Sequence, residues 1–148
     1  MAFKMGNEAR LWFQKLETGN PVFQTMFDKY YLCLLLGLKV RSQSEVNGDD
    51  FIDTFPKEYE SSRFSILGVI ISAEMKRQGL DFSDAGPLKR LVTKIIDPVS
   101  QSRLTSEGFN VANRYAAGGF EELRARVGAE SYPDKANLLM IRFGRDIL

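Results

Sequence analysis

Histidine is absent from all 148 residues of the sequence, and this absence removes the most common catalytic chemistries. Ser-His-Asp and Cys-His catalysis both need an imidazole, so both are excluded. Zinc sites with imidazole ligands are excluded as well, and a single cysteine cannot supply a thiolate site. Carboxylate, lysine or tyrosine chemistry and hard-metal binding stay open. No cluster of residues reaches a catalytic or cofactor signature, so we expect no catalytic residue, no cofactor and no metal.

Cysteine and long apolar runs are scarce as well. Cys33 is the single cysteine, so no disulfide can form within the chain, and we expect a buried free thiol that packs as a small apolar side chain. The two most apolar runs, 30–38 and 64–73, are each about ten residues long, against roughly 20 for a membrane-spanning helix. With no signal peptide visible, the sequence predicts a cytoplasmic chain that does not contact a membrane.

The composition is that of one ordinary globular domain. Hydrophobic residues make up 44% and charged residues 26%, and the net charge is +1. Positive and negative charges are spread over both halves, so neither half is a basic arm or an acidic tail. We therefore predict a single domain over residues 1–148.

Apolar residues recur at helical spacing along most of the chain. Asn20 followed by Pro21 is typical of a helix start, Gly79 of a helix end, and Thr105 of an N-cap. These signals predict six helices, over about 8–17, 20–40, 56–78, 84–97, 105–127 and 131–143. The helix over 56–78 is expected to be the most buried, because its middle is apolar on nearly every side. The predicted fold class is all-α, a compact bundle of about six helices.

Two polar or glycine-rich segments could carry a site. The acidic stretch with Glu45, Asp49, Asp50 and Asp53 lacks the ligand spacing of an EF-hand loop, so we read it as a solvated loop. Gly118 and Gly119 have neither the preceding strand nor the following lysine of a phosphate-binding loop. Those two glycines indicate either a helix break or a close helix crossing.

Two further groups of side chains are candidates for binding. Lys89, Arg90 and Lys94, with Arg114 on the next helix, are candidate contacts to a nucleic-acid backbone, although a solvated basic face is the simpler interpretation. A helix-turn-helix arrangement over 88–114 would need a shorter connection than 97–104. The aromatic residues of polar segments either anchor loops to the core or contact a protein partner. These candidate partner contacts are Phe51, Phe55 and Phe82.

Several short strings occur in a fixed order between about residues 20 and 125. They are FDKYYLCLLLGL from Phe27, DTFP from Asp53, AEMKR from Ala73, IDP from Ile96, LTSEG from Leu104 and YAAGGF from Tyr115. This order resembles small accessory proteins encoded in bacterial anti-phage clusters associated with DNA phosphorothioation. The resemblance implies a non-catalytic component that acts beside larger ATP-driven or nuclease subunits on DNA. None of the strings has a known mechanism, so no functional residue is carried over.

Three hypotheses follow from the sequence. The leading one is a non-catalytic interaction or accessory subunit of a multi-protein bacterial system, in the setting of anti-phage defence, with a protein partner. The second is a helical protein that binds DNA directly, which a strongly salt-dependent affinity for duplex DNA would distinguish. The third is a small carboxylate-based enzyme, which would need convergent acidic side chains in a pocket. A homo-oligomer is also expected as an alternative, because wide apolar helix stripes are often covered in dimers.

Overall fold

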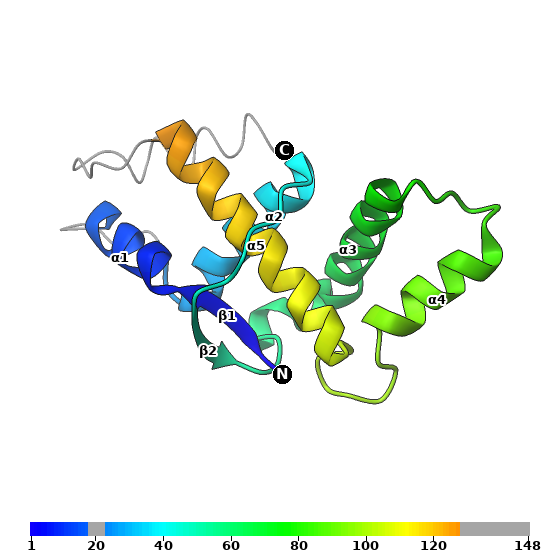
Figure 1. Cartoon of the computed structure of the whole chain (residues 1–148). Coiled ribbons are helices and arrows are strands. Elements are labelled where there is room, and N and C mark those ends of the chain that lie inside the picture. The colour runs from blue at the N-terminus through cyan, green and yellow to red at the C-terminus, as the bar shows by residue number, and fades with distance from the viewer. Residues whose placement is uncertain (18–22, 128–148) are drawn as a thin grey trace.

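A computed structural model of the chain describes residues 1–17 and 23–127. Within them, there are five α-helices, two of which form a close central pair, and two short strands pair at one side (Figure 1). The elements in chain order are β1 (Phe3–Gly6), α1 (Asn7–Leu16), α2 (Met26–Val40), β2 (Gly48–Ile52), the 3-10 helix η1 (Lys57–Ser62), α3 (Arg63–Gln78), α4 (Ala85–Ile95) and α5 (Ser106–Val127).

The two strands correct the all-α prediction: the chain is mostly helical with a small antiparallel sheet, and so α+β. β1 pairs with β2 from Phe3↔Ile52 to Gly6↔Gly48, with an irregularity after Phe3. Each strand has at most five residues, too few to show a clear alternating pattern. The strands are separated in the chain by α1 and α2, so there is no hairpin turn from which the pairing could be predicted.

The core is built around the crossing of α2 and α5. Gly119 and Gly37 allow the two backbones to touch: a Cβ on Gly119 would overlap the Cys33 carbonyl oxygen and lie 2.7 Å from the amide nitrogen of Gly37. α5 runs without a break through Gly118 and Gly119. Of the two interpretations of this glycine pair, the close helix crossing is therefore confirmed and the break is wrong. Cys33 is buried at this crossing, as predicted.

The helix limits follow local capping, with one correction. α2 begins at Met26, because the Thr25 hydroxyl accepts from the Asp28 amide and the Asp28 carboxylate accepts from the Thr25 amide. The helix was predicted to start at Asn20 and Pro21, but this capping box places the start of α2 at Met26. Asn20 and Pro21 themselves lie outside the described residues. Gly79 ends α3 with a left-handed φ of 70°, and Thr105 accepts from the Gly108 amide at the start of α5, as predicted. The helix predicted after 131 lies outside the described residues.

The prediction for 56–78 needs two corrections. The segment divides into η1 and α3 rather than forming one helix. α3 is also not the most buried helix, because the side chains of Phe64 and Val69 are 65% and 45% exposed, while α2 and α5 each bury a larger share of their residues. Apolar residues on the outer side of α3 thus face solvent, an arrangement that places a candidate site there.

Two buried polar side chains tie distant segments to the core. The Asn113 Oδ1 atom accepts from the Lys4 amide at 3.0 Å and from the Tyr30 hydroxyl at 2.8 Å, and its Nδ2 donates to the Ala2 carbonyl at 3.0 Å. These bonds fix β1 against α5. Glu74 is 2% exposed and accepts from Gln43, Arg77, Gln78 and Tyr115, joining α3, α5 and the segment before β2.

α5 separates two parts of the molecule in Figure 1. α1 and the sheet lie on one side of it, and α3 and α4 lie on the other, with α4 at the outer edge. Among the helices of residues 1–17 and 23–127, none combines the length and the apolar character that a membrane span needs.

Candidate functional site

An apolar groove runs along the outer side of α3. Its floor is formed by residues that recur at helical spacing over three turns of α3, and its other wall comes from the loops before α4 and after it. The lining residues are Phe64, Leu67, Gly68, Ile71, Ser72, Met75, Phe82, Ile96, Pro98 and Arg103. The groove encloses about 530 Å³, in the size range of ligand and peptide sites. We call it the α3 groove.

Two large aromatic side chains stand exposed at the α3 groove. Phe64 is 65% and Phe82 is 86% exposed, and Val99 beside the groove-lining Pro98 is 85% exposed. Single exposed apolar residues are ordinary on a protein surface, but a contiguous apolar hollow with exposed aromatic rings is typical of an interaction site. The hollow and the rings together, rather than any one residue, make this the leading candidate surface.

Guanidinium groups mark one end of the α3 groove. Arg63 lies over the ring of Phe64, 5.0 Å from its centroid, and donates from Nη1 to the Gln101 carbonyl at 3.1 Å. The buried Nε of Arg63 has no hydrogen-bond partner among the described residues. Arg103 lines the same end. This end can therefore accept a carboxylate, because a guanidinium offers several donors in a fixed plane.

The three aromatic residues predicted from the sequence as partner contacts lie in different places. Phe55 is 3% exposed and packs edge-on against Phe3 and Phe27, so it anchors its loop to the core. Phe51 is half-buried, with its ring 5.5 Å from that of Tyr30. Phe82 alone of the three stands exposed, at the α3 groove. Burial leaves Phe55 no surface to offer a partner, which corrects that assignment for Phe55.

The predicted basic residues separate in a similar way. Lys89, Arg90 and Lys94 are exposed together on the outer face of α4 and line a shallow hollow with Gly86 and Thr93. Arg114 belongs elsewhere: it is half-buried on α5 and forms an ion pair with Glu107 at 3.2 Å. The structure thus places Lys89, Arg90 and Lys94 on one face of α4, whereas the charge of Arg114 is balanced by Glu107.

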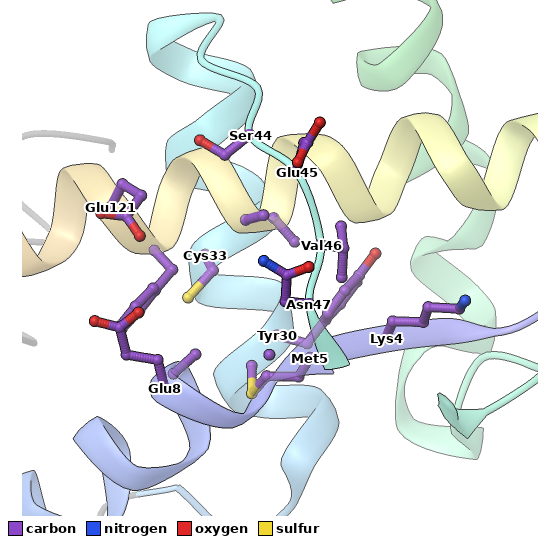
Figure 2. A pocket seen from close by; sticks show the side chains of 15 residues that line it. Lys4, Met5, Glu8, Tyr30, Cys33, Ser44, Glu45, Val46, Asn47 and Glu121 are labelled. Atoms are coloured by element: carbon purple, nitrogen blue, oxygen red, sulfur yellow. The ribbon is translucent and has the colours of Figure 1, made fainter. Parts of the chain in front are cut away.

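A third hollow, of about 120 Å³, lies between β1, α1, α2, α5 and the segment before β2 (Figure 2). Figure 2 shows Ser44, Glu45, Val46 and Asn47 on the segment that passes over α5, with Cys33 and Tyr30 beneath. This volume holds a few water molecules and is well below that of a typical ligand pocket. Burial raises the pKa of the Cys33 thiol, which makes this thiol a poor nucleophile at neutral pH.

The acidic stretch does not form a metal site among the residues described. Asp50 forms an ion pair with Lys4 at 3.6 Å, and Asp49 and Asp50 belong to β2. No three carboxylate or thiol side chains in residues 1–17 and 23–127 come close enough together to hold a metal ion. Glu74, which accepts hydrogen bonds from four different side chains, is buried among partners that hold its charge in place. Its environment is that of a structural group.

Sequence reasoning missed Phe64 and the α3 groove. The apolar residues of α3 run almost all round the helix, a pattern that predicts full burial. The sequence signal that could have found the site is the row Phe64, Gly68, Ile71 and Met75, next to an aromatic residue in the polar turn, Phe82. Which side of α3 lies against the core depends on tertiary packing, and the sequence does not state it.

No protein-family model matches the chain, and neither a curated protein nor a solved structure matches it.

Proposed function

We propose that the chain is a non-catalytic interaction subunit, whose α3 groove binds an amphipathic helix of a protein partner. The observation that carries this proposal is the groove with its exposed rings, Phe64 and Phe82. Residues 64 to 75 of α3 span about 16 Å, the length of three turns of a partner helix. Amphipathic helices commonly bind in such grooves through apolar anchors spaced three or four residues apart.

The ends of the groove specify the partner helix further. Arg63 and Arg103 at one end favour a helix that carries an aspartate or glutamate there, beside its apolar stripe. The occupant we propose is therefore an amphipathic helix with an apolar stripe and one acidic end.

The setting that the sequence resemblance implies, a bacterial anti-phage system acting on DNA, remains part of this proposal. It supports an accessory subunit because such a chain works beside larger partners. A carboxylate-based enzyme receives no support from the described acidic side chains, and it stays only as an alternative.

The proposal is tested by tagged purification from the cells that naturally express the chain. Three forms are compared: the unaltered chain, the double variant Phe64→Ser with Phe82→Ser, and the control Leu11→Ser, which alters an exposed apolar residue on α1. We expect one stoichiometric protein to remain through a high-salt wash with the unaltered chain and the control, because apolar contacts resist salt. We expect the double variant to lose it. Equal recovery with all three forms would contradict the proposal.

A further inference from the structure

A second surface, separate from the α3 groove, lies on the outer face of α4. Lys89, Arg90 and Lys94 are exposed on this face, and none of them forms an ion pair with a described residue. The opposite face of α4 buries Leu91 and Ile95 against the body of the protein. Packing of this apolar face therefore fixes the direction in which the three cations point.

The acidic groups near α4 are placed so that they leave these cations free. Asp81 and Asp84 lie at the N-terminal end of the helix, where the Asp84 carboxylate accepts from the Asp81 amide at 2.9 Å. Burial acts to raise the pKa of Glu107 on α5, but the hydrogen bond from Arg114 and smaller contributions, of which the charge of Lys94 is the smallest, together outweigh it and lower this pKa. No described carboxylate therefore forms an ion pair with Lys89, Arg90 or Lys94.

Charge is also segregated among the residues that the structure describes, although the net charge of the sequence is only +1. Residues 45–60 carry six acidic side chains and one lysine, and β2 within them lies across α5 from α4 (Figure 1). A charge asymmetry of this kind orients a molecule as it approaches a polyanion, with the basic edge leading. The near-neutral composition therefore conceals a basic edge.

From these observations we infer that the outer face of α4 binds the phosphate backbone of duplex DNA. Lysine and arginine side chains are usual donors to phosphate oxygens, and the three cations line one shallow hollow on this face. Lys89 and Lys94 are five residues apart, about 7.5 Å along the helix axis, or roughly two base-pair steps. A helix at the edge of a molecule can enter the major groove, which is about 12 Å wide. This inference stands apart from the proposed function, since the two surfaces share no residue.

The test measures binding of the full chain to a fluorescent mixed-sequence duplex by anisotropy, over a series of salt concentrations. The test variant is Lys89→Gln, Arg90→Gln and Lys94→Gln combined. The matched control is Lys15→Gln, Lys39→Gln and Lys57→Gln combined, which removes the same net charge from exposed positions elsewhere. Every substituted side chain is exposed, so both triple variants are expected to fold.

For three phosphate contacts, the logarithm of the affinity should fall with the logarithm of salt concentration with a slope of about −2.7. We expect the α4 variant to lose affinity on the order of tenfold or more at low salt, and its slope to approach zero, while the control keeps most of both. Absence of binding at low salt, or an equal loss in both triple variants, would overturn the inference. A polyglutamate peptide that competes as well as unlabelled duplex would overturn it too, in favour of an acidic protein surface.

Discussion

Gly119 of α5 lies directly against Cys33 of α2, so closely that any side chain on Gly119 would overlap the Cys33 carbonyl oxygen. This contact fixes the distance between the two central helices, because neither backbone can retreat without opening the core on its other side. Both candidate surfaces depend on it indirectly, since α4 packs against α5 while α3 packs against α2 and α4. Four predictions test the architecture that presents these surfaces.

The first prediction concerns the helix crossing. Gly119→Ala should lower the free energy of unfolding by about 3 kcal/mol, because the new methyl group meets backbone atoms that cannot rotate away. Chemical denaturation measures the change. The matched control is Gly68→Ala on α3, where a Cβ would meet open space. That substitution should raise stability by about 0.5–1 kcal/mol, because alanine favours a helix interior. Equal effects of the two substitutions would contradict the close crossing.

The second prediction concerns the attachment of β1. Asn113→Ala should weaken the protein by about 2 kcal/mol and speed hydrogen exchange at the Lys4 amide, which loses its acceptor, Asn113 Oδ1. The control is Asn110→Ala, which alters an exposed asparagine one turn earlier on α5. It should leave the Lys4 amide as protected as before. Unchanged exchange in the Asn113 variant would show that β1 is held by other contacts.

The third prediction uses the pKa of Glu74. Burial acts to raise this pKa, but hydrogen bonds from Arg77, Tyr115 and Gln78 outweigh it, so the pKa lies below its ordinary value of 4.5. A depressed carboxylate pKa contributes stability that is present above the unfolded-state value and is lost as the pH falls through the folded-state value. Glu74→Gln should therefore lower stability by about 2 kcal/mol near neutral pH and by less in acid.

Thermal unfolding across acid and neutral pH measures this difference. The melting temperatures of the unaltered chain and the Glu74→Gln variant should converge as the pH falls. Glu60→Gln, at an exposed position on η1, serves as the control and should follow the unaltered chain throughout. A constant gap between the Glu74 variant and the unaltered chain at every pH would mean that the carboxylate charge is not what stabilises the network.

The fourth prediction separates two phenylalanines from polar segments. Phe55→Ala should cost about 3–5 kcal/mol, because the ring is buried among Phe3 and Phe27. Phe82→Ala should change stability by less than about 0.5 kcal/mol, because its ring is exposed. Chemical denaturation of the two variants and of the unaltered chain measures both changes in stability. A large cost at Phe82 would mean that its ring belongs to the core and is not available to a partner.

Local signals in the sequence predicted much of the helical framework. The ends of α3 at Gly79 and of α4 before Pro98, and the start of α5 at Thr105, follow from capping and from backbone restriction by proline, which depend on near neighbours. The buried state of Cys33 followed from its apolar surroundings. Features set within a few residues were therefore predictable.

Features set by distant contacts were not. β1 pairs with β2, a polar strand that follows α2 in the chain, and both strands are too short to show an alternating pattern in the sequence. Phe55 and Phe82 have similar polar neighbours in the sequence, yet one is buried and the other exposed, because the fold places one loop over the core and the other at its edge. The α3 groove was missed for the same reason: its existence depends on which side of α3 the core covers.

The most direct test of the α3 groove as a docking site is site-specific photo-crosslinking in the cells that naturally express the chain. A photoreactive phenylalanine derivative replaces Phe82, and in a control chain it replaces Leu11 on α1. We predict that position 82 crosslinks to one partner protein, within an amphipathic helix that carries an acidic residue, and that Phe64→Ser abolishes the product. Crosslinks from position 82 no stronger than those from position 11, or only to a second copy of the chain, would contradict the account.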